Sequence, residues 1–249
     1  MGGTTEANRF AALAAERFVP ALYSYAGRVN TPKQQPLPLR VGGFGGVKGL
    51  TDFILREEIC ALIDATHPFA AQMSRNAVEA CQLSGTPLLA IERPAWKEIP
   101  TDNWTHVRDM KQAANALSGL KKNVFLAIGR QQIDYFVNHP QHRYLLRFVD
   151  QPETEIPFPD YNLIVDRGPF DLQADLDLLQ RYEIDIIVSK NAGGTGAFTK
   201  IQAARELGLS TIMIDRPSLP GREAVPDEGK ALNWLHSTCP SLFPRNLGV

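Results

Sequence analysis

The sequence predicts an α/β fold with parallel sheets, and three observations support this. Short apolar runs rich in Val, Ile and Leu alternate along the chain with amphipathic stretches. Most of these runs lack a strict alternation of polar and apolar residues, as expected of strands that helices cover on both faces. The length of 249 residues allows one large domain or two small ones.

Seven apolar runs are expected to form strands, and the stretches between them to form helices. Apolar residues recur every three or four positions from Ala70 to Ala80 and from Leu172 to Tyr182, which predicts buried helix faces. Further helices are expected at residues 7–17, 47–57 and 228–236 and from residue 199. The expected strands are residues 19–25, 59–65, 87–91, 123–128, 144–149, 184–189 and 211–214.

A stretch rich in proline and polar residues, 93–104, predicts a domain boundary near Glu98. We therefore expect two Rossmann-like domains with a cofactor cleft between them. Residues 1–98 would bind a dinucleotide, and residues 99–249 would complete the substrate cleft.

Composition excludes several classes of function. The 26 Lys and Arg residues balance 27 Asp and Glu residues, which disfavours binding to nucleic acid or to a membrane surface. The three cysteines share no CxxC spacing and the five histidines are scattered, so no metal site is expected. No apolar run approaches the roughly 18 residues that span a bilayer, and we expect a cytoplasmic protein.

The first candidate site is a glycine turn, Gly2, Gly3 and Thr4, that opens directly into the helical stretch 7–17. Glycines let the backbone approach a diphosphate, and a helix N-terminus favours its negative charge. The full Rossmann glycine spacing is absent, so a plain turn in which Thr4 caps the helix is the alternative.

The next candidate strand ends near Ser24 and is followed by Arg28, about twenty residues after the glycine turn. Dinucleotide folds often place an acidic residue there, on the adenine ribose. An arginine at this point favours a ribose that carries a 2′-phosphate. A solvated surface arginine is the alternative interpretation.

Two glycine pairs surround one aromatic residue in the loop that follows Arg40. Four glycines among five residues cost chain entropy when the loop is ordered, so such loops usually lie against a ligand or another backbone. We expect cofactor contact here, and a helix–strand packing turn is the alternative. The loop consists of Gly42, Gly43, Phe44, Gly45 and Gly46.

Two further strand ends carry polar side chains. Asp64, Thr66 and His67 follow one strand, and His67 is a candidate proton donor that Asp64 would orient, or else a structural residue. Lys190 closes another strand before the turn formed by Asn191, Gly193 and Gly194. A lysine there can hold anionic groups or polarise a reacting atom, unless it is simply solvated.

Together these segments resemble the precorrin-6A reductase family of cobalamin biosynthesis over nearly the whole chain. The resemblance rests on GGTTEA, AGR, RVGGFGG, DATHPFA, ERPAW, KNAGG, AAREL and a final DRP, in this order. It implies a two-domain reductase that takes hydride from NADPH and reduces one ring double bond of precorrin-6A to give precorrin-6B. The anaerobic cobalt-precorrin-6A reductases and a non-catalytic tetrapyrrole or nucleotide carrier are the alternatives.

The resemblance implies a role for each candidate residue. The glycine turn and the glycine loop, together with Ser24 and Thr66, would bind NADPH, with Arg28 at its 2′-phosphate. Arg40, Arg93 and Arg216, with Asn191 and its glycine turn, would meet the carboxylates of the macrocycle. Lys190, Asp64 and His67 would deliver a proton or polarise the substrate. We expect a monomer, and because the family usually has an apolar strand before the glycine turn, we expect the first strand to be missing.

Overall fold

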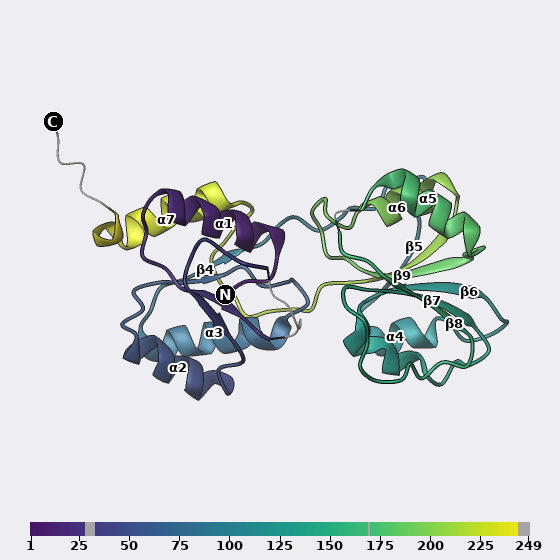
Figure 1. The fold of residues 1–249 in the computed structure, drawn as a ribbon, viewed down its shortest axis with the longest axis horizontal. Coiled ribbons are helices and arrows are strands. Elements are labelled where there is room, and N and C mark those ends of the chain that lie inside the picture. The colour runs from purple at the N-terminus through teal and green to yellow at the C-terminus, as the bar shows by residue number, and fades with distance from the viewer. Residues whose placement is uncertain (28–32, 169, 244–249) are drawn as a thin grey trace. The chain divides into compact units, whose positions relative to one another are not determined.

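The computed structural model describes residues 1–27, 33–168 and 170–243, and the chain forms two compact units. Unit 1 comprises Met1–Pro94 and the chain from Ser218, and unit 2 comprises Ala95–Pro217 (Figure 1). The chain therefore leaves unit 1 once and returns to it.

Unit 1 is built on parallel strands. β1 (Tyr23–Tyr25) pairs with β2 (Leu39–Val41), while β3 (Leu62–Asp64) pairs with β4 (Leu88–Ile91), and β4 pairs with β11 (Ala224–Val225). Each of these ladders is parallel, as the sequence predicted.

Helices cover both faces of the strands of unit 1 (Figure 1). On one face, α1 (Thr5–Glu16) and α7 (Glu228–Thr238) share an apolar cluster with β1 and β4, and the short 3-10 helix η2 (Pro240–Leu242) follows α7. On the other, α2 (Gly46–Arg56) packs with α3 (Ala71–Ser84) through Leu50, Ile54 and Ala77.

The chain start connects the two groups of strands in unit 1. The amine of Met1 donates to the Ile63 carbonyl oxygen at 2.8 Å, and the Ala65 N–H donates to the Met1 carbonyl oxygen at 3.0 Å. The Gly2 N–H donates to the Ser24 carbonyl oxygen at 3.0 Å. Met1 and Gly2 thus lie between β1 and β3.

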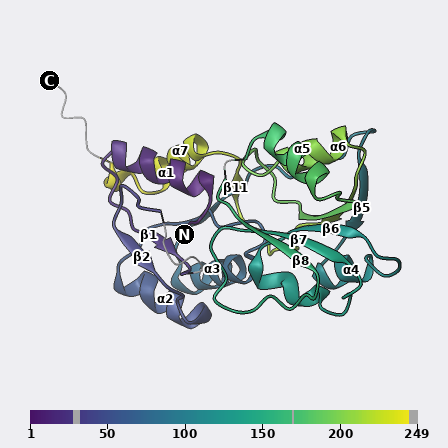
Figure 2. The same ribbon diagram turned by 45° about the vertical axis from the view of Figure 1, so that its right-hand side comes forward.

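Unit 2 contains a six-stranded parallel sheet in the order β5-β10-β9-β6-β7-β8. Figure 2 shows β7 and β8 side by side in this sheet. Its core includes Phe125, Leu145 and Ile187, which are all buried. The strands are β5 (Asn103–Val107), β6 (Asn123–Ala127), β7 (Arg143–Phe148), β8 (Tyr161–Val165), β9 (Ile186–Lys190) and β10 (Ser210–Ile214).

Helices also flank the sheet of unit 2. α5 (Leu172–Arg181) and α6 (Thr199–Glu206) lie together, and α4 (Met110–Asn115) lies on the opposite side of the sheet (Figure 1). A 3-10 helix, η1 (Arg130–Phe136), follows β6.

The structure agrees with the predicted α/β class with parallel sheets and differs from the predicted division of the chain. Each of the seven expected strands corresponds to a strand, whereas β2, β5, β8 and β11 were not expected. The division into 1–98 and 99–249 differs most at the end of the chain. Residues from Ser218 onward belong to unit 1, because β11 pairs with β4 and α7 packs against α1.

Within the described ranges, none of the helices is both long enough and apolar enough to cross a membrane.

Candidate functional site

The strand order of unit 1 creates a switch point at its carboxyl edge. β1 leads to β2 on one side, whereas β3 leads to β4 on the other. Open α/β sheets bind ligands outside the carboxyl ends of strands at such a reversal. The turn from Gly2 to Thr4 emerges between β1 and β3 at this point.

Tyr23 holds the glycine turn on one side, and the turn is open on the other. The Gly3 N–H donates to the Tyr23 hydroxyl at 2.9 Å, and a Cβ at Gly2 would lie 2.3 Å from the Tyr23 ring. Gly3 has a φ of 112°, and a Cβ built there would meet no atom within 4 Å. The Gly3 backbone is thus accessible to a ligand at the start of α1.

Thr4 fixes this turn to the neighbouring strand. Its hydroxyl donates to the Ala65 carbonyl oxygen at 2.8 Å and accepts the Ala7 N–H at 3.1 Å, which caps α1. The capping role that the sequence suggested is therefore present. The two bonds of the Thr4 hydroxyl hold the N-terminus of α1 at the switch point, where the helix dipole favours an anion.

The glycine loop before α2 also faces open space. Gly42, Gly45 and Gly46 have φ values of 121°, 78° and 91°, and no atom lies within 4 Å of a Cβ built at any of them. Residues with a side chain rarely adopt such φ angles, which explains why glycine occupies these positions. A Cβ at Gly43 would also have no atom within 4 Å.

Arg40 supports the glycine loop from β2. Its guanidinium donates to the carbonyl oxygens of Gly42 at 2.5 Å and Gly43 at 2.7 Å, and it lies 3.8 Å from the centre of the Phe44 ring. It also reaches the Ser24 hydroxyl at 3.4 Å. The structure therefore places Arg40 at the predicted cofactor loop.

Asp64 is buried at the end of β3, with 2% of its surface exposed. It accepts hydrogen bonds from the Thr66 N–H at 3.1 Å, the Thr66 hydroxyl at 2.7 Å and the Ser74 hydroxyl at 2.7 Å, and it pairs with the Arg222 guanidinium. Burial alone would raise the pKa of Asp64, but the hydrogen bonds of Ser74 and Thr66 and the Arg222 charge together lower it.

Two other predicted residues of unit 1 have identified partners. The His67 Nδ1 accepts the Phe69 N–H at 3.2 Å, which stabilises the turn into α3. The Arg93 guanidinium donates to the Glu6 carboxylate at 2.6 Å, and both side chains are 16% exposed. This ion pair connects the end of β4 with the first turn of α1.

Unit 2 has its own switch point, between β6 and β9. The strands run from β6 to β8 on one side, whereas β9 and β10 lie on the other. Lys190 ends β9 there, and its ammonium group donates to the Ile128 carbonyl oxygen just after β6 at 2.7 Å. The predicted lysine therefore lies where such a sheet binds ligands.

The turn after Lys190 is fixed by Asn191 and Trp96. The Asn191 amide accepts the Trp96 N–H at 2.8 Å and donates to the Trp96 carbonyl oxygen at 3.0 Å, and the Trp96 indole donates to the Gly194 carbonyl oxygen at 2.7 Å. Gly193 and Gly194 both have a φ of 69°. Arg216 donates to the carbonyl oxygens of Asn191 and Ala192 at 3.0 and 3.1 Å.

Arg28 lies outside the described residues. Sequence analysis did not identify Arg222 or Trp96, because each acts on a site residue from a distant part of the chain. It also did not identify Ser74, which binds Asp64 from the first turns of α3. Within the described residues, no three His, Cys, Asp or Glu side chains form a group that would hold a metal ion.

Comparison with known proteins gives a consistent picture. The family model described as precorrin-6x reductase CbiJ/CobK matches residues 1–236. A precorrin-6A reductase of Rhodobacter capsulatus is 51% identical over 235 residues, which are 94% of each chain. One from a Sinorhizobium species is 44% identical over 94% of this chain and 92% of that protein.

A solved structure described as CobK precorrin-6A reductase matches with a TM-score of 0.93 and 49% identity, covering 99% of this chain and 97% of that one. A cobalt-precorrin-6A reductase of Priestia megaterium is 31% identical and covers 68% of this chain and 70% of that protein. With its family model matched over residues 1–236, the chain belongs to the precorrin-6x reductase family of oxidoreductases.

Proposed function

We propose that this protein reduces one ring double bond of precorrin-6A, with NADPH as the hydride donor, to give precorrin-6B in cobalamin biosynthesis. The observation that carries the proposal is the pair of open glycine segments at the carboxyl edge of unit 1, in a chain of this family. The relatives that match over 94% of the chain are precorrin-6A reductases, which favours this substrate over its cobalt form.

The residues present fit a dinucleotide. Glycine backbone at Gly3, Gly42, Gly45 and Gly46 faces open space, so a ligand can approach it closely without meeting a side chain. The N-terminus of α1 favours the charge of a diphosphate. When bound, NADPH would supply the hydride, while the chain binds and orients the reactants.

We assign Arg28 to the 2′-phosphate because it follows β1 closely in the sequence. Arg40 holds the glycine loop in shape through its bonds to Gly42 and Gly43. We therefore give Arg40 a positioning role at the cofactor, in addition to the expected contact with substrate carboxylates.

We assign Asp64 a positioning role. Its carboxylate is buried and already binds Thr66, Ser74 and Arg222, so it fixes the turn that presents Thr66 and His67 at the carboxyl edge of β3. Of the residues expected to move a proton, His67 and Lys190 are better placed, because neither is fully buried. Reduction requires one proton besides the hydride.

On the substrate side, Lys190 and the backbone of Gly193 and Gly194 are proposed to contact the macrocycle. Asn191 and Arg216 hold this turn in place. Arg93 pairs with Glu6 and is proposed to reach a substrate carboxylate from that pair.

Anaerobic absorbance of the purified protein with NADPH and freshly prepared precorrin-6A tests the proposal, with NADH in a parallel cuvette. We expect loss of the nicotinamide absorbance together with a change in the pigment spectrum, and faster loss with NADPH. Pigment that binds while both spectra stay unchanged would favour a non-catalytic carrier. Turnover restricted to the cobalt form would instead assign the anaerobic substrate.

A further inference from the structure

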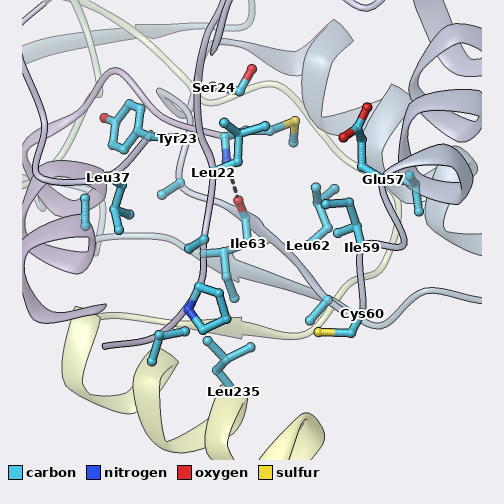
Figure 3. Close-up of a pocket in the computed structure, with 18 of the residues that line it drawn as sticks. Leu22, Tyr23, Ser24, Leu37, Glu57, Ile59, Cys60, Leu62, Ile63 and Leu235 are labelled. Carbon is cyan, nitrogen blue, oxygen red and sulfur yellow. Dashed lines mark hydrogen bonds between the residues drawn. The ribbon is translucent and has the colours of Figure 1, made fainter. Parts of the chain in front are cut away.

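Two of the three cysteines, Cys60 and Cys239, lie next to each other in unit 1. Cys60 lies in the connection between α2 and β3, and Cys239 follows the last residue of α7. The Cys239 thiol donates to the Cys60 carbonyl oxygen at 3.4 Å and is also in hydrogen-bond contact with the Cys60 side chain. Figure 3 shows Cys60 together with the α7 residue Leu235, which lines the same apolar cavity.

Backbone hydrogen bonds hold the chain at both cysteines. The Cys239 N–H donates to the Leu235 carbonyl oxygen at 2.8 Å, which closes the last turn of α7. Directly before Cys60, the Ile59 N–H donates to the Ile54 carbonyl oxygen at 2.9 Å. A disulfide forms only between cysteines that the backbone already brings close together. The two bonds therefore keep the thiols within reach of one another.

The two thiols differ in their access to solvent. Cys60 is exposed, whereas only 7% of Cys239 is exposed. Burial raises the pKa of the Cys239 thiol, and so do its hydrogen bond with the Cys60 side chain and the negative charge of the Cys60 thiolate. The thiolate, not the thiol, is the reactive nucleophile of a cysteine. Cys60 is therefore the group that meets a dissolved oxidant first, while Cys239 stays protonated beside it.

The third cysteine, Cys81, provides an internal comparison. It lies within α3, and 4% of it is exposed. Burial, together with the nearby Asp64 charge, raises the pKa of the Cys81 thiol to about 11. Buried thiols with a raised pKa react slowly with oxidants. The structure therefore favours oxidation at Cys60 over oxidation at Cys81.

We propose that Cys60 and Cys239 form a reversible disulfide when the protein meets a hydroperoxide. The Cys60 thiolate attacks one peroxide oxygen, the O–O bond breaks, and the hydroxide that leaves takes up the proton that Cys60 released. The resulting Cys60 sulfenic acid is neutral, so its charge no longer opposes ionisation of Cys239. The Cys239 sulfur then attacks the Cys60 sulfur, the S–O bond breaks, and the hydroxyl group leaves as water with the proton of Cys239. The two thiols thus lose two electrons, and the hydroperoxide is reduced.

The disulfide joins parts of unit 1 that are 179 positions apart in the sequence. The loop that it closes includes all of unit 2, because the chain returns to unit 1 only at Ser218. Closing so long a loop restricts the unfolded chain, which stabilises the folded one. Cys60 precedes the first residue of β3, whereas the proposed cofactor site lies at the carboxyl edge of the strands. The site is therefore independent of the proposed reaction.

Titration of the purified full chain with hydrogen peroxide tests the proposal. The remaining thiols are alkylated in denaturant, and the peptides are analysed by mass spectrometry without reduction. We expect one link between the Cys60 and Cys239 peptides of the same chain, with Cys81 still alkylated. The oxidised protein should unfold at a midpoint at least about 4 °C above that of the reduced protein. Dithiothreitol should restore both thiols and the original midpoint.

Two variants complete the test. Cys60→Ser changes one atom of an exposed side chain, so the reduced variant should keep the midpoint of the parent, and peroxide should no longer raise it. Cys81→Ala is the matched control and should still form the link. A Cys60 disulfide to a second copy of the chain, or Cys60 oxidised to a sulfinic acid while Cys239 stays a free thiol, would overturn the proposal. An equal response of the parent and Cys60→Ser to peroxide would also overturn it.

Discussion

Removing the Asp64 carboxylate should cost unit 1 a large share of its stability. Arg222 is buried beside it, with 9% of its side chain exposed, and its other ion pair is a longer one to Glu92 at 3.4 Å. Removing one partner of a buried pair typically costs about 3 to 5 kcal/mol, because the remaining charge is left without its counter-charge. We expect Asp64→Ala to fall in this range, as the hydroxyls of Thr66 and Ser74 also lose their acceptor.

Asp64→Asn should cost less at neutral pH, since it keeps the size of the side chain and an acceptor for Thr66. Its effect should also depend on pH. The folded pKa of Asp64 is lowered, so the carboxylate contributes stability above the unfolded value of about 3.9 and loses it as the pH falls through the folded value. Asp64→Asn should therefore flatten the acid limb of the stability profile.

Urea unfolding followed by circular dichroism, at pH 7 and at a series of acid pH values, measures both effects, with separate transitions fitted for the two units. Asp52→Asn is the matched control, because Asp52 belongs to an exposed pair with Lys48 and should leave the midpoint unchanged. An Asp64→Ala protein within about 1 kcal/mol of the parent at pH 7 would refute this account of the buried cluster.

Three further predictions concern single side chains. Arg28→Ala should weaken NADPH by about 10- to 150-fold, the effect of a charge-assisted contact worth about 1.5 to 3 kcal/mol, and should leave NADH nearly unchanged in a titration; equal losses would remove Arg28 from the 2′-phosphate. Lys190→Ala should lower kcat while the NADPH affinity stays constant, and an unchanged kcat would leave the lysine without a substrate role. Burial, with the nearby Arg147 charge and against that of Asp175, lowers the pKa of Lys200 to about 7. Because the unfolded chain then binds more protons, unit 2 should gain stability from pH 7 to about 10, and Lys200→Met should abolish that gain in urea unfolding.

Local backbone requirements made part of the geometry of the proposed cofactor region predictable. Thr4 caps α1, as one interpretation of the sequence indicated, and the glycine-rich composition of the loop is explained by the positive φ angles at Gly42, Gly45 and Gly46. The strands that the sequence analysis did not predict are short or largely exposed. β2 follows a proline-rich stretch, β5 at the sheet edge carries mainly exposed residues, and β11 has only two residues.

Contacts between residues far apart in the sequence explain the features that could not be predicted. Arg222 pairs with Asp64 across 158 positions of sequence, and Trp96 meets Asn191 across 95. Neither contact can be predicted from neighbouring residues in the sequence. The local sequence therefore suggests that Asp64 faces the substrate and that Asn191 binds it. The return of the chain to unit 1 likewise depends on the pairing of Ala224 and Val225 with β4.

Hydride transfer is the central claim, and isotope transfer tests it most directly. The protein is incubated anaerobically with precorrin-6A and NADPH that carries deuterium at the transferable C4 position, and the macrocycle is analysed by mass spectrometry. We predict that the product gains one deuterium from NADPH and one hydrogen from solvent. A reduced product without deuterium from either labelled face of NADPH, or a macrocycle that remains unreduced, would contradict the account.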